Sequence, residues 1–127
     1  MKIVIDSNRY TDLARGIPEV IEVVEKADVV YMPLIVLAEQ RAGFAHGSKR
    51  EKNERILTRF LNTDGIFILA PDEQTTFFYA EVYASLRKRG KPIPTNGIWI
   101  AASCIQHGYI LYDRDSDFDH VQQLARI

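Results

Sequence analysis

The chain has 127 residues, 46% of them hydrophobic and 26% charged, and a formal net charge of −1. These proportions exclude global disorder, and the length fits a single domain over residues 1–127. No apolar run approaches the ~20 residues of a membrane span, and no signal-peptide pattern precedes Asp6, so we expect a soluble cytoplasmic protein. The only cysteine, Cys104, lies in an apolar stretch and is expected to be a buried, reduced thiol.

The predicted elements alternate between strands and helices along the chain. Four short apolar runs, rich in β-branched residues, predict strands over residues 2–6, 29–32, 66–69 and 109–112. Helices are predicted between them, over residues 8–15, 17–26, 33 to 43 or 47, 49–62, 71–86 and 95–108. This alternation is typical of βαβ units, and therefore of a parallel sheet with helices on both faces.

Two of these helices carry more specific expectations. Pro71 and Asp72 are start signals for the helix that ends near residue 86, whose stripe of Tyr79, Val82, Tyr83 and Leu86 is expected to face the core. An interface is the alternative for the two tyrosines. Thr95 is expected to cap the helix that follows, which should end near residue 108.

Acidic residues follow the first and the fourth predicted strands. Asp6 ends the first, and four acids in seven residues follow the fourth: Asp113, Asp115, Asp117 and Asp119. Such crowding costs electrostatic repulsion unless a cation lies among the carboxylates. If the two strands are neighbours, both sets lie at the carboxyl edge of one sheet, where open α/β folds keep their active sites.

Each acid also has an ordinary structural explanation. Asp6 could cap the helix that follows it, and Glu39 could be a solvated residue at the edge of a helix. Ser7 and Asn8 could orient a carboxylate or fix a turn. Capping and turns explain one or two of the four late aspartates but not all of them. Because alternate residues of an extended loop point the same way, three of them could converge on one centre: Asp113, Asp115 and Asp117.

The residue types in this cluster favour a hard metal ion. Carboxylates without a cluster of His or Cys favour Mg²⁺ or Mn²⁺ over zinc. Such a metal activates water and neutralises charge on a phosphate, which suits hydrolysis of a phosphodiester.

Basic residues form two separate groups that could hold a polyanion such as RNA. The candidates for RNA binding are Lys49, Arg50, Arg87, Lys88 and Arg89. Two ordinary solvated helix ends are the alternative explanation.

Four short motifs in order resemble those of a PIN domain, and specifically of the VapC-type toxins of toxin–antitoxin pairs. They are residues 5–8 (IDSN), 37–39 (LAE), 94–102 (PTNGIWIAA) and 113–118 (DRDSDF), and the resemblance covers nearly the whole chain. It implies a three-layer α/β/α sandwich around a mostly parallel sheet of four to five strands. It also implies a metal-dependent endoribonuclease, usually homodimeric, that is silenced by an antitoxin whose peptide covers the acidic site.

Matched by position, the resemblance assigns most of a metal-binding site. Asp6 is similar to the first acid of the family, Glu39 to the second and Asp115 to the fourth, with Asp117 as an accessory acid. The third acid is missing, because the residue after Thr-Asn96 in the family pattern is an aspartate and here is Gly97. Asp113 is a second departure, since the family usually has Thr or Ser there.

Three explanations of Gly97 remain open. It is an engineered or selected substitution that inactivates a protein toxic to its expression host, or it is natural and Asp113 supplies the lost negative charge, or the domain is naturally degenerate and binds without cutting. Two functions follow from these explanations: a metal-dependent ribonuclease, weakened or inactive in this form, or a catalytically silent module that binds RNA or an antitoxin.

Overall fold

Four short strands form one parallel sheet in the computed structural model, which describes all residues from 1 to 127. The strands are β1 (Lys2–Ile5), β2 (Val29–Pro33), β3 (Ile66–Leu69) and β4 (Ile110–Tyr112), in the order β3-β2-β1-β4. In β1 and β4, Ile5 lies opposite Tyr112. The residues that follow these strands, Asp6 and Asp113, therefore emerge side by side at the carboxyl edge of the sheet.

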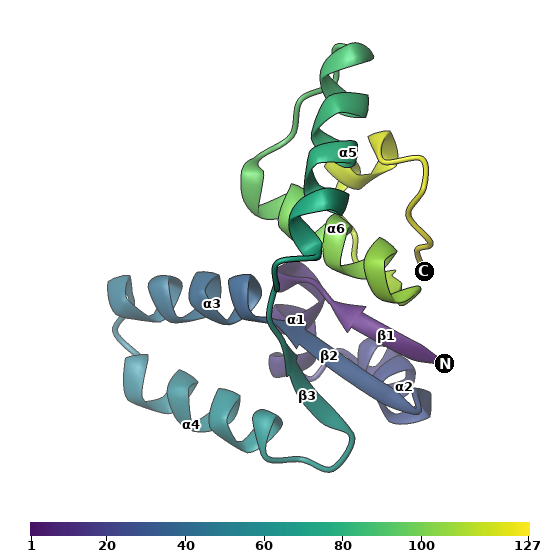
Figure 1. Cartoon of the computed structure of the whole chain (residues 1–127). Coiled ribbons are helices and arrows are strands. Elements are labelled where there is room, and N and C mark those ends of the chain that lie inside the picture. Colours follow the sequence, from purple (N-terminus) through teal and green to yellow (C-terminus); the bar gives the residue numbers. More distant parts are fainter.

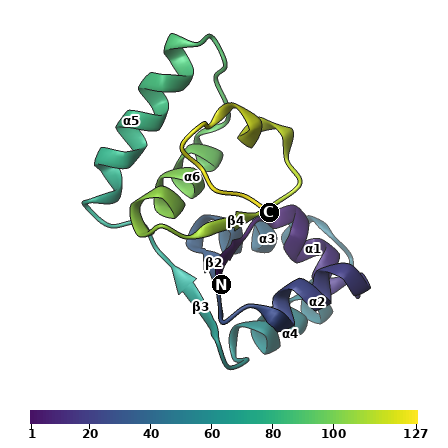
Figure 2. The ribbon, with the colours of Figure 1, turned by 90° about the vertical axis from the view of Figure 1, so that its right-hand side faces the viewer.

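Six α-helices and one 3₁₀ helix surround the sheet. The helices are α1 (Ser7–Ala14), α2 (Pro18–Lys26), α3 (Leu34–His46), α4 (Arg50–Leu61), α5 (Thr75–Lys88), α6 (Thr95–His107) and the 3₁₀ helix η1 (Ser116–His120). Figures 1 and 2 show α5 and α6 on one side of the sheet and α1, α2 and α4 on the other. The expected α/β sandwich with a four-stranded parallel sheet is confirmed.

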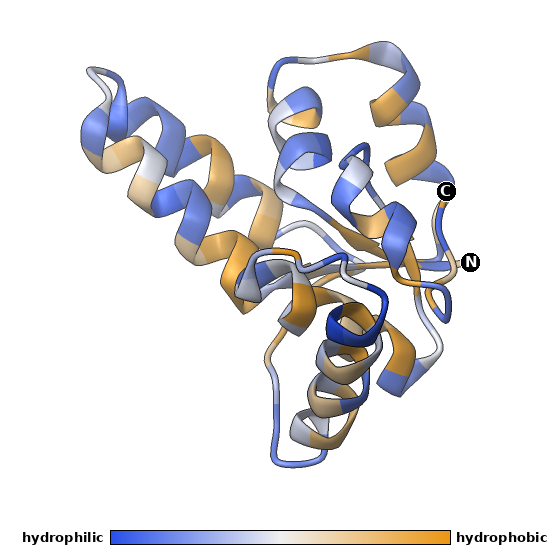
Figure 3. Cartoon of the chain, turned by 90° about the horizontal axis from the view of Figure 1, so that it is seen from above, coloured by the Kyte–Doolittle hydropathy of each residue, from blue (hydrophilic) through white to orange (hydrophobic).

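One continuous hydrophobic core joins the two helical layers to the sheet. Ile3, Val4 and Ile5 of β1 are fully buried, and α6 adds a buried face that includes Ile98 and Ala101. Figure 3 shows apolar residues on the central strands and polar residues on the outer tips of the helices. Complete burial of one such aliphatic side chain stabilises the fold by about 1.5–3 kcal/mol, so the central strands are the firmest support for the residues at their ends.

Several local predictions were wrong, each for a physical reason. Helix α5 begins at Thr75 because the carboxylate of Asp72 accepts hydrogen bonds from the backbone N–H of Thr75 (3.0 Å) and from its hydroxyl (3.1 Å), which makes a turn first. Thr95 does not cap α6 but is its first residue, with Pro94 at the N-cap position. Tyr83 is 41% exposed, although Val82 and Leu86 of the same stripe are buried and Tyr79 packs against the core.

Other expectations hold. The helix α6 ends at Gly108, whose φ of 70° is in the left-handed region that favours glycine. Cys104 is a free, buried thiol. No helix in the structure combines the length and the apolar character that crossing a bilayer requires.

Candidate active site

A cavity of about 170 Å³ opens at the carboxyl edge of the sheet. Its polar lining consists of four acids, two amides, a hydroxyl and a glycine: Asp6, Glu39, Asp115, Asp117, Asn8, Asn96, Ser7 and Gly97. These residues come from the end of β1, from helices α1, α3 and α6 and from the segment after β4, so polar residues up to 111 positions apart in sequence meet here. Eight of the residues predicted for the site are therefore gathered around one cavity.

Asp6 lies at the floor of this cavity, directly after β1. It occupies the N-cap position of α1, but its side chain makes no capping hydrogen bond, so the capping explanation is wrong. Its backbone is fixed on both sides, because its N–H donates to the carbonyl of Tyr112 (3.1 Å) and its carbonyl accepts from the N–H of Tyr10 (2.9 Å). Only 6% of the residue is exposed.

Burial makes the charge of Asp6 costly. Burial, and to a lesser degree the neighbouring carboxylates of Glu39, Asp113 and Asp115, raise the pKa of Asp6 to about 6, against a smaller opposing effect of the backbone N–H of Ser7. Such a buried carboxylate is stabilised either by taking up a proton or by binding a cation. Acids whose pKa is shifted and that lie in a cavity are characteristic of functional sites.

Glu39 on α3 is held at the rim of the cavity by two other helices. The hydroxyl of Ser7 on α1 donates to its Oε1 at 2.9 Å, and the amide of Asn96 on α6 makes a long contact of 3.5 Å with its Oε2. The amide of Gln40 also donates to the carbonyl of Ser7 (3.3 Å). Ser7 thus orients a carboxylate, which is one of the two roles that its position predicted.

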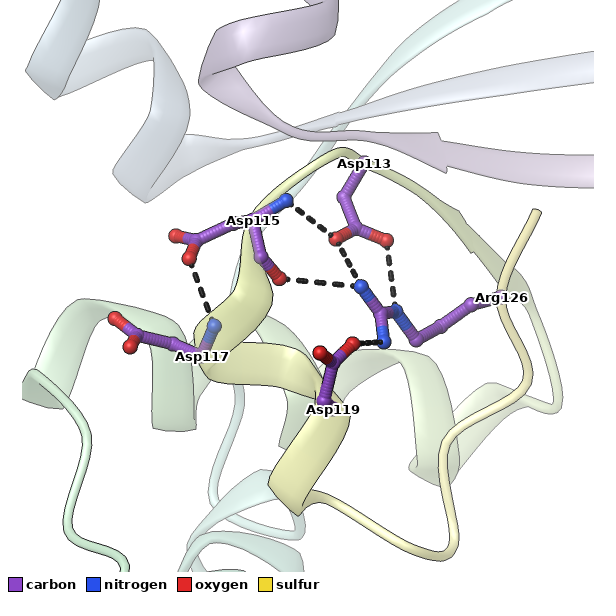
Figure 4. Close-up of polar contacts among 5 residues, drawn as sticks. All are labelled: Asp113, Asp115, Asp117, Asp119 and Arg126. Atoms are coloured by element: carbon purple, nitrogen blue, oxygen red, sulfur yellow. Dashed lines mark hydrogen bonds and ion pairs between the residues drawn. The ribbon is translucent and has the colours of Figure 1, made fainter.

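Asp115 and Asp117 complete the acidic lining from the segment after β4. The Oδ1 of Asp115 accepts a hydrogen bond from the N–H of Asp117 (2.9 Å) and so caps the 3₁₀ helix η1. The segment is extended only as far as Asp115, since η1 begins at Ser116. Even so, Figure 4 shows both carboxylates directed to the same side.

The structure does not bring Asp113 to the cavity. Its carboxylate forms a two-pronged ion pair with Arg126, at 3.0 Å from Nε to Oδ1 and 2.7 Å from Nη2 to Oδ2 (Figure 4). Asp119 also pairs with Arg126, at 2.6 Å. Arg126 was not among the predicted residues, and no spacing pattern marks it, because its partner lies 13 residues earlier in the chain.

The acids of the cavity have no cationic side chain to balance them. None of the four takes part in any ion pair in the protein, whereas nearby arginines pair elsewhere, Arg126 as above and Arg114 with Asp12. The oxygen donors fit Mg²⁺ or Mn²⁺ by their chemistry. As the side chains stand, no three acidic, His or Cys groups are gathered closely enough to ligate one ion. A metal would therefore require the carboxylates to turn inward.

Gly97 leaves a gap in this lining, in the first turn of α6. That turn contains no acid. A Cβ added at Gly97 would lie 3.3 Å from the Cδ1 of Ile93 and 3.7 Å from the ring of Phe118. Because the Ile93 methyl is the flexible end of a side chain, a small shift makes room for a larger residue. Glycine is thus not required here by crowding.

The two basic groups lie apart from each other and from the cavity. Lys49 and Arg50 lie where α4 begins, at the outer end of the α3–α4 pair in Figure 1. Arg87 to Arg89 lie at the C-terminal end of α5, which is the outer end of that helix. All five basic residues are exposed, and none lines the cavity. Their role in binding RNA stays a prediction.

Comparison with known proteins adds independent information. Residues 3–124 match the family model of the PIN domain. Ribonuclease VapC1 of Haemophilus influenzae is 27% identical over 129 residues, which cover 98% of this chain and 95% of the relative. Ribonuclease VapC2 of Rickettsia felis is 27% identical over 105 residues, which cover 82% of this chain and 77% of that protein.

Solved structures show the same fold. The structure of VapBC-1 from nontypeable Haemophilus influenzae matches with a TM-score of 0.87 and 25% identity, over 100% of this chain and 97% of that one. VapBC2 from Rickettsia felis, bound to a DNA fragment from the promoter, matches with a TM-score of 0.87 and 24% identity, over 100% and 98% of the two chains.

Proposed function

The chain belongs to the PIN domain family, and we propose that it is the ribonuclease toxin of a toxin–antitoxin pair, which hydrolyses RNA with the help of Mg²⁺ or Mn²⁺. The observation that carries the proposal is the set of four unpaired acids around one cavity: Asp6, Glu39, Asp115 and Asp117. The relatives named ribonuclease VapC, similar over most of their length, support the choice of substrate.

The roles of the residues follow from their places. Asp6 and Asp115 would hold the metal from the ends of neighbouring strands, with Glu39 and Asp117 at the rim. The bound metal supplies an activated water and neutralises charge on the phosphate. Ser7 keeps Glu39 turned to the cavity, and Asn96 approaches the same carboxylate from α6. Because the pKa of Asp6 is raised to about 6, a proton and the metal ion would compete for this carboxylate as the pH falls below neutral.

Gly97 makes this form a weakened enzyme. The acid that the family carries at this position is absent, so a metal ion would have one carboxylate fewer to hold it, and the attacking water would be less well placed. A misplacement of about 1 Å can lower a rate by about a hundredfold.

RNA would approach between the two basic tips and place one phosphate at the cavity. Lys49, Arg50 and Arg87 to Arg89 are the candidates for contacts with its backbone. The matched VapBC structures further support a cognate antitoxin as partner. We also propose a homodimer, as the family resemblance implies.

Restoring the missing acid tests the catalytic proposal. The Gly97→Asp protein should cut an RNA pool in the presence of Mg²⁺ or Mn²⁺ and not with EDTA, and adding Asp6→Asn should abolish cleavage. Gly97→Asn is the matched control, since it fills the same space without the charge. If folded Gly97→Asp protein leaves the RNA intact with both metals, the ribonuclease proposal is wrong.

A catalytically silent module that binds RNA or an antitoxin is the second candidate, and Gly97 itself is the observation that favours it. This candidate predicts that both the unsubstituted protein and its Gly97→Asp variant bind RNA in a filter or gel-shift assay without turnover. Metal-dependent cleavage by Gly97→Asp would exclude it.

A further inference from the structure

The last residues of the chain return to the sheet and lie beside its edge strand β4. The backbone N–H of Leu111 in β4 donates to the carbonyl of Ala125, and the N–H of Ile127 donates to the carbonyl of Leu111, both at 2.9 Å. Arg126 thus pairs with Leu111 as a parallel β-bridge. Figure 2 shows the C-terminus next to β4. This pairing with β4 therefore fixes the position of the Arg126 backbone.

From this position Arg126 neutralises a carboxylate that has almost no access to water. The side chain of Asp113 is 1% exposed and that of Arg126 is 26% exposed, and their two hydrogen bonds run in parallel. A two-pronged bond of this kind fixes orientation as well as distance. Both oxygens of Asp113 are occupied by it, so we infer that Asp113 does not replace the acid missing at Gly97.

The same guanidinium also holds the segment that carries the cavity acids. Nη2 donates to the carbonyl of Asp115 (3.1 Å) and Nη1 donates to Asp119 (2.6 Å). On its other side, the backbone N–H of Asp115 donates to Asp113 (3.0 Å). Both peptide groups of Asp115 are therefore bound to the ion pair, and in Figure 4 the carboxylates of Asp115 and Asp117 point away from Arg126.

We propose that Arg126 is a positioning residue: through Asp113 and the backbone of Asp115 it holds Asp115 and Asp117 at the cavity. Its effect on metal binding rests on the proposed function, whereas its effect on the order of the segment does not. The C-terminal residues are thereby part of the scaffold of the site, although they contribute no group to its lining.

The order of the segment can be measured by amide hydrogen exchange in the protein without metal. The test variant is Asp113→Asn with Arg126→Gln, because removing both charges leaves no unpaired buried carboxylate and the protein should fold. The matched control is Glu54→Gln with Arg41→Gln, which removes an exposed two-pronged pair (3.0 and 3.1 Å) between α3 and α4.

The proposal predicts at least about tenfold faster exchange at the amides of Asp115 and Asp117 in the test variant, with β1 unchanged, and no change at these amides in the control. Unchanged exchange at Asp115 and Asp117 would overturn the proposal. Equal acceleration at every amide would also overturn it, because Arg126 would then contribute only global stability.

Mn²⁺ titration separates this proposal from the proposed function. In the Gly97→Asp background, the test variant should bind Mn²⁺ about tenfold more weakly, as loss of a residue that orients a ligand typically does. If both proteins bind Mn²⁺ equally, the positioning role is wrong and the metal site stands. If neither binds Mn²⁺ while exchange at Asp115 accelerates as expected, the metal site is wrong and the positioning role stands.

Discussion

Two groups of acids lie on opposite sides of the segment after β4, and they differ in how their charge is met. On the cavity side, Asp6, Glu39, Asp115 and Asp117 have no cationic partner. On the other side, Asp113 and Asp119 share Arg126. We propose that the paired group orders the segment and that the unpaired group binds a cation. Composition alone does not distinguish the two groups, since all but Glu39 are aspartates.

Removing one charge from each group in the Gly97→Asp protein should separate the two groups most strongly. Asp115→Asn should lower the rate of RNA cleavage by about a hundredfold or more, because a lining carboxylate is lost and the water is misplaced. Asp119→Asn, in the same segment but outside the cavity, should change the rate by less than about threefold. Initial rates on a labelled RNA measure both, and equal losses would contradict the division.

The buried ion pair of Asp113 with Arg126 should contribute more to stability than an exposed pair. Arg126→Met should lower the free energy of unfolding by about 3 kcal/mol, because it leaves the buried carboxylate of Asp113 without a partner. Arg41→Met removes the exposed pair with Glu54 and should cost less than about 1 kcal/mol. Urea denaturation at pH 7.5 compares the two, and a similar small cost for both would show that Asp113 is not held as described.

Removing the charge of Asp6 should raise the stability of the protein, and this effect should depend on pH. The pKa of Asp6 is raised from 3.8 to about 6, so the folded state binds its proton more tightly than the unfolded state. Stability from this group is therefore full below about pH 4 and is lost as the pH rises through about 6. At pH 7.5 Asp6→Asn should stabilise the metal-free protein by up to about 3 kcal/mol.

At pH 4 the same substitution should have little effect, because Asp6 is then protonated in the folded state. Denaturation of both proteins across this pH range measures the difference. A stabilisation that is constant with pH would show that Asp6 does not titrate as its burial implies.

The smallest effect is expected at Gly97. Gly97→Ala should raise stability by about 0.5 kcal/mol, since alanine is favoured over glycine in a helix and the one close contact of its Cβ is with the flexible end of Ile93. A thermal melt measures the change. A clear destabilisation would mean that glycine is required by packing and is not simply an absent acid.

The sequence predicted the fold because the fold depends on local patterns. Short apolar runs marked β1 to β4, and the acids at the ends of β1 and β4 meet because parallel neighbours end at one edge. The lining of the cavity could be predicted for the same reason, with Glu39 and Asn96 added from the family resemblance.

The division among the late aspartates could not be predicted. It depends on Arg126, whose place is set by a β-bridge between Leu111 and the C-terminus, and no local pattern encodes such a contact. The exposure of Tyr83 is a similar case, because the stripe on α5 does not reveal how much of the helix the core covers.

We propose that the unpaired acids form a metal site that lacks one carboxylate, at the position of Gly97. Calorimetric Mn²⁺ titrations of the unsubstituted protein, Gly97→Asp and Gly97→Asn test this proposal. We predict that Gly97→Asp binds Mn²⁺ at least about tenfold more tightly than the other two, which should behave alike. Equal affinity in all three proteins, or no binding by Gly97→Asp, would contradict the claim.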